Sequence, residues 1–259
     1  AGLWQAGQGH FEEQVLCRLE ITVMGKIRLD KYLADMGLGT RSQVKQQIRK
    51  GSVTVNGEIV KTPDYKIDIE EDRVAAGGKC LAYETFSYYM LYKPQGVVSA
   101  TEDKRDKTVL DLLVSKKRKD LFPVGRLDKD TEGLLLITND GELAHNLLAP
   151  KKHVDKTYLV KLRYSVSEED LKQLESGVDI GEKEKTLPAA ANWYQGEKDQ
   201  VLLTIREGKF HQVKRMFAAL GNKVVALHRW RIGNVELDES LEEGEFRPLT
   251  QEEIDNLVK

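Results

Sequence analysis

The first regular pattern of apolar and polar positions begins at Ile27 and predicts two short helices. Apolar residues recur at intervals of three and four over 29–36, which is the spacing of one helix face. A second helix is predicted over 40–50, because Thr40 and Gln43 have the spacing of a capping box. Both predicted helices end at glycines, which readily adopt the backbone conformation that terminates a helix.

Alternating apolar residues over 53–59, with an Asn56-Gly57 turn between them, predict a β-hairpin after the second helix. On that helix Arg41, Lys45 and Arg49 follow one another at steps of four and therefore share a face. None of them has a carboxylate four residues further on with which to pair. We therefore predict that this face binds RNA phosphates; the alternative is a solvated helix surface.

A polar stretch over 64–84 precedes the rest of the chain and predicts a domain boundary near 81–86. Beyond it strands and helices alternate, with strands predicted over 88–92, 134–138, 157–162, 201–206 and 223–227, and helices over 143–148, 168–176 and 211–220. This order predicts an α+β fold with a mixed, largely antiparallel sheet and flanking helices. The predicted units are an extension over 1–23, a small α/β unit over 24–84 and a larger unit over 85–259. For the extension we expect disorder or a start that is not native; a short ordered helix is the alternative.

Composition is that of an ordinary folded protein, with 40% hydrophobic and 32% charged residues. No apolar run reaches the roughly 18 residues that a membrane-spanning helix needs, and no secretory signal pattern begins the sequence. Cys17 and Cys80 are far apart, so we expect free thiols in a reducing cytoplasm. The five histidines are scattered and no dinucleotide or phosphate-loop fingerprint occurs, so we expect neither a metal nor a nucleotide cofactor.

The formal net charge of -2 conceals a strongly uneven distribution of charge. Residues 24–62 contain eight Lys and Arg against three Asp and Glu, and residues 206–231 contain seven against one. Residues 236–255 balance them with nine acidic residues and one arginine. Since binding to a polyanion depends on the local field, the two basic segments favour RNA as a partner.

A charged loop over 125–133 runs directly into the apolar run 134–137. A buried strand would anchor this loop and hold the carboxylate of Asp128, two residues after Arg126, in a fixed orientation for nucleophilic or base chemistry. Spacing alone leaves a second interpretation open, because most charged turns are solvated connections.

The loop resembles the Gly-Arg-Leu-Asp motif of the RsuA-type pseudouridine synthases, which isomerise uridine in ribosomal RNA. Three further segments resemble motifs of that family in the family's order: Lys93-Pro94-Gln95-Gly96, Lys156-Thr157-Tyr158 and Glu207-Gly208-Lys209-Phe210-His211-Gln212-Val213-Lys214-Arg215-Met216. The resemblance extends from Met24 to the C-terminus. Within it, 24–84 resembles the S4-type RNA-binding domain that a small-subunit ribosomal protein shares with tyrosyl-tRNA synthetases.

The resemblance implies that Asp128 is the catalytic carboxylate and that Arg126 holds the displaced nucleotide. Tyr158 corresponds to the tyrosine that stacks on the uracil, although alone it would be interpreted as a half-buried strand residue. Lys214 corresponds to the cationic partner of the catalytic carboxylate, and as a lysine it should make a single contact with Asp128. Whether Arg215 shares that role stays open.

The remaining expectations concern the surface around this site. Asp130 is expected to be a surface residue. The residues expected to contact RNA are Arg41, Lys45, Arg49, Lys93, Lys209, His211, Gln212 and Arg215.

The same resemblance implies isomerisation of a flipped-out uridine in 16S ribosomal RNA, within a pre-30S particle, by a monomer that needs no cofactor and binds no membrane. The choice of the small subunit depends on the sequences 211–217 and 227–233. The alternatives are an enzyme of 23S ribosomal RNA and a non-catalytic ribosome-assembly factor that binds RNA. A metal-dependent nuclease built on Asp128 and Asp130 lacks further ligands at suitable spacing.

Overall fold

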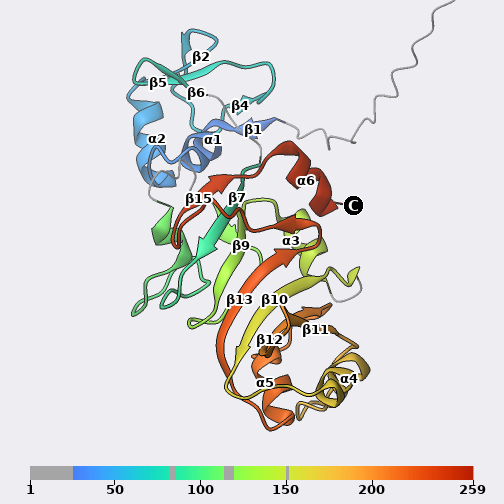
Figure 1. Cartoon of the computed structure of the whole chain (residues 1–259). Helices are drawn as coiled ribbons and strands as arrows, with labels where there is room; N and C mark the ends of the chain where they lie inside the picture. Colours follow the sequence, from blue (N-terminus) through green and yellow to red (C-terminus); the bar gives the residue numbers. More distant parts are fainter. Residues whose placement is uncertain (1–25, 82–85, 114–119, 150–151, 259) are drawn as a thin grey trace, which may run out of the picture. The chain divides into compact units, whose positions relative to one another are not determined.

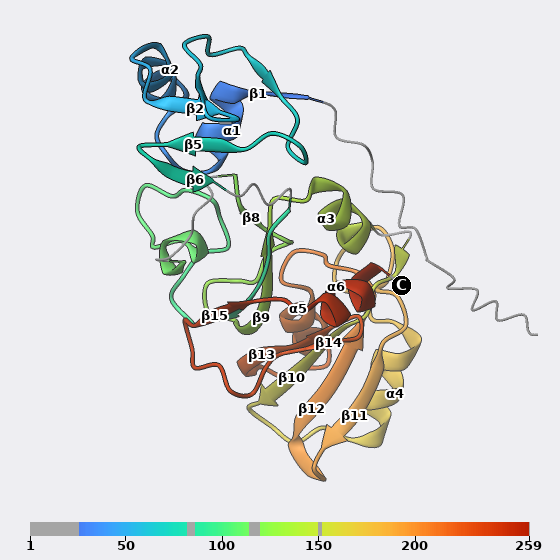
Figure 2. The same cartoon turned by 90° about the horizontal axis from the view of Figure 1, so that it is seen from above.

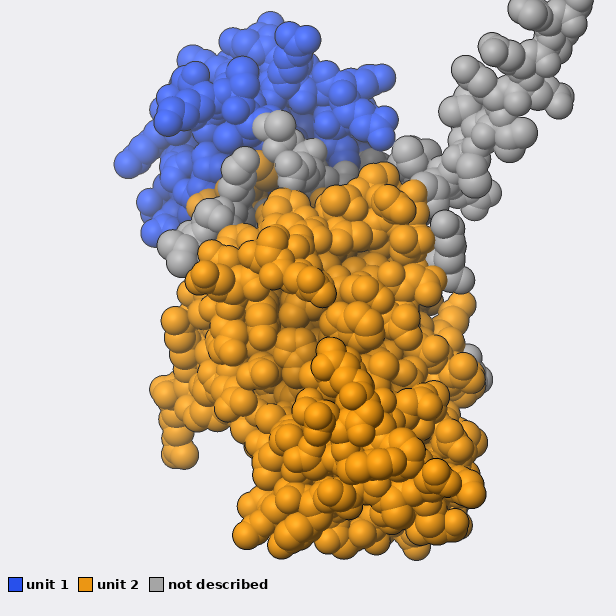
Figure 3. Space-filling view, viewed as in Figure 1, with its two compact units in different colours: residues 1–34, 38–82 blue, residues 35–37, 83–259 orange. Residues whose placement is uncertain are grey.

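The computed structural model describes residues 26–81, 86–113, 120–149 and 152–258. The chain divides into two compact units, one of residues 1–34 and 38–82 and the other of residues 35–37 and 83–259 (Figure 3). The segment 1–23 and Cys17 lie outside the described residues, so the expectations for them stay predictions. Cys80 is a free, exposed thiol.

The first unit combines two helices, α1 (Leu29–Asp35) and α2 (Arg41–Arg49), with short strands (Figure 1). The predicted capping box at the start of α2 is confirmed. The backbone amide of Gln43 donates to Thr40 Oγ1 at 3.3 Å, and the amide of Thr40 donates to Gln43 Oε1 at 2.8 Å. Val44 and Ile48 are fully buried, and the basic side chains of α2 lie on the adjacent face of the helix.

The predicted hairpin of the first unit is also confirmed. Asn56 and Gly57, the two turn residues, have φ values of 54° and 86°, as a tight two-residue hairpin requires. The four-stranded sheet has the order β3-β2-β5-β6, and β1 pairs with β4 outside it. The strands are β1 (Ile27–Arg28), β2 (Val53–Val55), β3 (Glu58–Ile59), β4 (Lys66–Ile67), β5 (Val74–Ala76) and β6 (Lys79–Leu81).

The second unit is built on a nine-stranded sheet with the central order β11-β12-β10-β13-β9-β7-β15, to which β14 and β8 are added at β13 and β9 (Figures 1 and 2). All of its pairs are antiparallel except β9 with β13. The α+β fold with a mixed, largely antiparallel sheet is therefore confirmed. The strands are β7 (Tyr88–Lys93), β8 (Phe122–Pro123), β9 (Glu132–Thr138), β10 (Lys156–Leu162), β11 (Ala190–Tyr194), β12 (Glu197–Ile205), β13 (Val224–Ile232), β14 (Val235–Glu236) and β15 (Phe246–Pro248).

Helices cover both faces of this sheet. On one face α4 (Glu168–Ser176) and α5 (Gln212–Ala219) contribute to a large apolar cluster with β10 and β12. On the other face α3 (Gly141–Leu148) and α6 (Gln251–Val258) pack in a smaller cluster with β7 and β9. A short 3₁₀ helix, η1, spans Val109–Leu112. The face that carries α5 is the one that matters for the candidate site.

Strand β13 is longer than the sequence pattern predicts, since it continues through the polar residues 228–231 to Ile232. The apolar pattern ends at Leu227, but the following side chains have partners within the sheet. Arg229 Nε donates to the carbonyl of Leu134 at 2.8 Å, and His228 Nδ1 lies 3.6 Å from Glu132 Oε1. Tertiary partners therefore extend a strand that local periodicity ends.

The parallel pairing of β9 with β13 extends over only two residue pairs, His228 with Glu132 and Arg229 with Gly133. Gly133 permits this close approach. A Cβ atom built on it would lie 2.3 Å from the carbonyl oxygen of Arg229, and its φ of 107° also disfavours any other residue. The point where β9 meets β13 thus requires glycine.

We expect Gly133→Ala to lower the free energy of unfolding by about 3 kcal/mol, because the methyl group must separate β9 from β13 and strain the backbone. Chemical denaturation measures this loss. Gly141→Ala is the matched control: it lies in the first turn of α3 with open space around it, so it should be neutral or stabilise by about 0.5 kcal/mol. Equal stabilities of the two variants would contradict the assigned role of Gly133.

Candidate active site

The loop that carries Asp128 is fixed by a buried lysine. Lys93, at the end of β7, is completely buried, and its ammonium group donates to the carbonyls of Pro94, Asp128 and Thr131 at 3.0, 3.0 and 2.7 Å. Its three donors are therefore used. Burial lowers the pKa of Lys93 to about 8, against the opposing effect of the carboxylates of Asp128 and Asp130.

Lys93 was expected to contact RNA, and this prediction is wrong, because the side chain has neither exposure nor a free donor. Its function is to position the loop. Two further contacts complete the support: Ser99 Oγ donates to the carbonyl of Leu127 at 2.9 Å, and the amide of Gly96 donates to the carbonyl of Lys129 at 2.7 Å. Nothing in the sequence pattern identified Ser99.

The side chain of Asp128 points to the start of α5. Lys214 Nζ donates to Asp128 Oδ2 at 2.9 Å, and 28% of the Asp128 side chain stays exposed. The single contact expected from a lysine is therefore observed. The carboxylate is held by the protein yet remains open to a substrate.

Asp130 also takes part, which the sequence did not predict. Its side chain is 70% exposed, but its Oδ1 accepts from Lys214 Nζ at 2.5 Å. The hydrogen bond from Lys214 lowers the pKa of Asp130. Burial acts to lower the pKa of Lys214. The hydrogen bonds to Asp130 and Asp128 outweigh the effect of burial, so the pKa of Lys214 is raised. Lys214 is therefore a charged bridge between two carboxylates.

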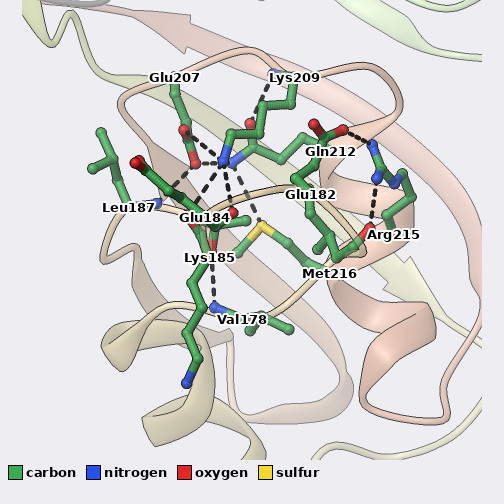
Figure 4. Close-up of polar contacts among 12 residues, drawn as sticks. Val178, Glu182, Glu184, Lys185, Leu187, Glu207, Lys209, Gln212, Arg215 and Met216 are labelled. Atoms are coloured by element: carbon green, nitrogen blue, oxygen red, sulfur yellow. Dashed lines mark hydrogen bonds and ion pairs between the residues drawn. The ribbon is translucent and has the colours of Figure 1, made fainter.

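Arg215 does not share the role of Lys214. Its guanidinium contacts Glu182 Oε1 at 2.7 Å (Figure 4) and donates to the carbonyls of Phe210 and Ile180. The question that the sequence left open is thus answered in favour of Lys214 alone.

The turn before α5 is held by polar side chains that were expected to contact RNA (Figure 4). Gln212 is buried; its amide nitrogen donates to Glu207 at 2.8 Å and its oxygen accepts from the Lys209 amide at 2.9 Å. An RNA contact is therefore wrong for Gln212. Lys209 Nζ donates to the carbonyls of Glu184 and Lys185 and lies 3.5 Å from Glu207. Lys209 and Arg215 thus have protein partners, and we do not assign them to RNA.

His211 lies beside the carboxylate of Asp128. Its Nε2 is 3.5 Å from Asp128 Oδ1, and its backbone is left-handed, with a φ of 49°. Phe210, which precedes it, is 74% exposed and stacks on the His211 ring with a centroid distance of 3.8 Å. Phe210 lies inside the motif 207–216, but no role was predicted for its side chain.

Tyr158 and Arg126 complete the set of residues expected in the site. Tyr158 is buried on β10, in the same apolar cluster as Leu127 and Val213, the residues that precede Asp128 and Lys214. Arg126 is exposed and forms no hydrogen bond or ion pair with any residue in the described ranges. It is therefore free to bind a ligand. The roles of both residues stay predictions.

The basic face of α2 belongs to the first unit and is described by itself. Arg41 and Arg49 are exposed, while Lys45 Nζ lies 3.7 Å from Asp30 Oδ2. A carboxylate partner therefore exists for Lys45, but it comes from α1 and not from the same helix. Arg28 also binds Asp30, at 2.9 Å.

Two general expectations can be compared with the described part of the chain. No helix in it is long and apolar enough to cross a membrane. In the same ranges no group of three or more His, Cys, Asp or Glu side chains is arranged to hold a metal ion.

Comparison with known proteins agrees with this geometry. The sequence model of the RNA pseudouridylate synthase family matches residues 87–219, and that of the S4 domain matches residues 27–74. The chain belongs to the pseudouridine synthase family, with an S4 domain before the synthase domain.

Individual relatives cover almost the whole chain. The chain is 49% identical to "Ribosomal small subunit pseudouridine synthase A" of Vibrio vulnificus (strain CMCP6) over 90% of its length and 100% of that protein, and 46% identical to the protein of the same name from Escherichia coli (strain K12) over the same shares. It is 49% identical to "Uncharacterized RNA pseudouridine synthase YtzG" of Bacillus subtilis (strain 168), over 88% and 97%. A solved structure titled "Crystal structure of pseudouridylate synthase" matches with a TM-score of 0.64 and 48% identity, over 90% of this chain and 100% of that one.

We expect Lys214→Met to reduce synthase activity at least about 100-fold, because Asp128 loses the cation that orients it. Stability should fall by only about 1 kcal/mol, since the Asp128 and Lys214 side chains are 28% and 25% exposed and water screens the pair. Tritium release from RNA labelled at uridine carbon five measures the activity, and thermal unfolding measures the stability.

Two controls separate the role of Lys214 from a general charge effect. Asp130→Asn should change activity by less than about threefold, because its carboxylate is largely exposed and Lys214 keeps Asp128. Lys161→Met removes a comparable ion pair, 2.6 Å from Asp199, and should leave activity unchanged. An equally large loss in either control would contradict the specific pairing of Lys214 with Asp128.

Proposed function

We propose that this protein isomerises a uridine to pseudouridine in 16S ribosomal RNA. The observation that carries the proposal is the carboxylate of Asp128, which a buried lysine fixes through the backbone, Lys214 orients through the side chain, and solvent can still reach. The relatives named for the ribosomal small subunit, at up to 49% identity, support the choice of 16S over 23S ribosomal RNA.

The reaction breaks the bond between ribose carbon one and uracil nitrogen one and forms a bond from the same carbon to uracil carbon five. The proton lost from carbon five is balanced by one gained at nitrogen one, so no oxidant or cofactor is consumed. In our proposal Asp128 acts at the sugar carbon as a nucleophile or stabilises its positive charge. The Lys214 ammonium orients the carboxylate through its hydrogen bond to Oδ2. We propose that Tyr158 packs against the uracil while it turns.

The target base must leave its stack to reach Asp128, because the ribose carbon of a paired nucleotide is inaccessible. Arg126, which is exposed and has no partner among the described residues, is suited to a phosphate of the displaced nucleotide. The S4 domain supplies a second RNA-binding surface. We further propose a monomer that acts in the cytoplasm on an assembling pre-30S particle.

A non-catalytic assembly factor is the alternative from another class. Such a factor would have no need of Asp128, Lys214 and Lys93 in a connected arrangement, and the structure retains all three in contact. Mapping pseudouridine in ribosomal RNA from cells that lack this protein tests the proposal directly. Loss of one site in 16S RNA supports it; an unchanged map overturns it, and a lost site in 23S RNA selects the large-subunit alternative.

Asp128→Asn should reduce turnover at least about 1000-fold while RNA affinity changes by less than about threefold, because the carboxylate serves chemistry and not docking. Asparagine keeps the shape and an oxygen that can accept from Lys214. Tritium release and filter binding on the same 16S transcript provide the two measurements. Substantial turnover by the Asn variant would remove Asp128 from the mechanism.

Replacing Arg41 and Arg49 by Gln should weaken RNA binding and reduce the slope of log affinity against log salt by about two, one unit for each lost phosphate contact. Both side chains are exposed, so stability should not change. Lys45 is left in place because it contacts Asp30. The control is Lys172→Gln with Lys183→Gln, two exposed lysines of the second unit. If the slope equals that of the control, the basic face of α2 does not bind RNA phosphates.

A further inference from the structure

Phe210 has a large apolar ring that is exposed to solvent. It is 74% exposed, the largest exposed fraction among the large apolar residues in the described ranges. A lone exposed apolar residue is common on protein surfaces, so exposure by itself carries no conclusion. The position of the ring, beside the residue that contacts Asp128, is what requires an explanation.

The protein holds the turn under Phe210 in a fixed and strained conformation. Gln212 contacts Glu207 and Lys209, and Glu207 accepts from the amide of Leu187 at 2.8 Å, which fastens the turn to a neighbouring loop (Figure 4). Arg215 Nη1 donates to the carbonyl of Phe210 at 3.1 Å. These contacts fix the backbone of the turn, but none of them covers the Phe210 ring.

His211 connects this ring to the catalytic centre. A left-handed conformation at a residue other than glycine costs on the order of 1 kcal/mol and persists only where the surroundings enforce it. This conformation aligns the His211 ring with that of Phe210 at an interplanar angle of 20° and places Nε2 3.5 Å from Asp128. The two rings therefore form a short stack that begins at Asp128 and ends in solvent.

We propose that Phe210 is a stacking platform for an RNA base next to the target uridine, an inference that rests on the proposed function. The target uridine itself must lie at Asp128, and the ring of His211 lies between Asp128 and Phe210. The base that stacks on Phe210 therefore belongs to a neighbouring nucleotide. Aromatic side chains recognise unstacked bases in this way, and flipping the target leaves its neighbours without one stacking partner.

The surroundings favour RNA over an apolar protein surface as the occupant. Arg126, on the loop of Asp128, is exposed and has no partner in the part of the chain that the structure describes, so it can bind a phosphate of the same strand. An apolar protein partner would more often be met by a contiguous apolar patch. Around Phe210 the described structure instead has the polar side chain of His211, which lies beside Asp128.

Substitutions at Phe210 separate stacking from packing. Phe210→Ala and Phe210→Leu should lower kcat/KM on a 16S transcript by about 10- to 100-fold, mainly through KM, while Phe210→Tyr and Phe210→Trp keep it within about threefold. Leucine has the apolar surface but lacks the aromatic face. All four variants should unfold at the temperature of the native protein, because the ring is exposed.

The matched control is Tyr164→Ala. Tyr164 is an aromatic residue that is 57% exposed and lies beside Asn222, beyond the C-terminal end of α5, whereas Phe210 lies before its N-terminal end. Its replacement should leave kcat/KM unchanged. A Leu variant as active as the native protein, or an equal loss in Tyr164→Ala, would overturn the proposal.

A second measurement identifies the base. Once the target is mapped, synthetic RNAs that lack the base on one or the other side of it are assayed with the native protein and with Phe210→Ala. If Phe210 stacks on that base, Phe210→Ala should have the same kcat/KM as the native protein on the RNA from which the base is missing. If the effects of Phe210→Ala and of base removal on kcat/KM are additive for both RNAs, the proposal is overturned and a protein partner is indicated. Absence of any turnover by the native protein would instead reject the proposed function, so the two failures are distinct.

Discussion

The loop that carries Asp128 depends on one buried ammonium group. A charged lysine in the interior is costly unless its donors are satisfied, and Lys93 meets that condition with the three carbonyls of Pro94, Asp128 and Thr131. Two of these carbonyls belong to the loop of Asp128, so the loop cannot move without leaving a buried charge unpaired. The lowered pKa of Lys93 records what burial costs the charged form, and the attraction of Asp128 and Asp130 partly offsets it. Lys93 thus fixes the position of Asp128 through the backbone of its loop.

The loop of Asp128 leads into β9, whose parallel pairing with β13 is short. Strands β9 and β13 share only two residue pairs. Beyond these pairs the guanidinium of Arg229, and not a backbone amide, donates to the carbonyl of Leu134. Arg229 is 3% exposed, and one of its Nη atoms has no hydrogen-bond partner among the described residues. Its positive charge acts to lower the pKa of Lys93.

The sequence predicted the regular parts of the protein better than the contacts at its site. The capping box at Thr40, the Asn56-Gly57 hairpin and the helix 168–176 follow from local rules, and all three are present. The pairing of Asp128 with Lys214 came from the family motifs, and the structure shows that contact. The roles of Lys93 and Gln212 were wrong, because a motif identifies a side chain without showing whether it points to solvent or to the interior. The involvement of Asp130 was missed for a related reason, since it depends on an ion pair with a residue 84 positions away.

The charge distribution also shows that the sequence does not reveal which charged side chains are paired within the protein. This matters for RNA binding. The seven Lys and Arg of 206–231 predicted an RNA-binding segment. Six of these side chains have partners among the described residues. The pairs are Arg206 with Asp155, Lys209 with Glu207, Lys214 with Asp128 and Asp130, Arg215 with Glu182, Arg229 with Leu134 and Arg231 with Glu236. Counterion release from RNA requires cations that can reach phosphates, and a cation paired within the protein contributes less of that effect. The basic character of this segment therefore serves chiefly to hold the site together. We infer that electrostatic attraction of RNA depends more on exposed cations such as Arg126, Arg41 and Arg49, while the segment that resembled an RNA-binding patch positions the groups that act on the target.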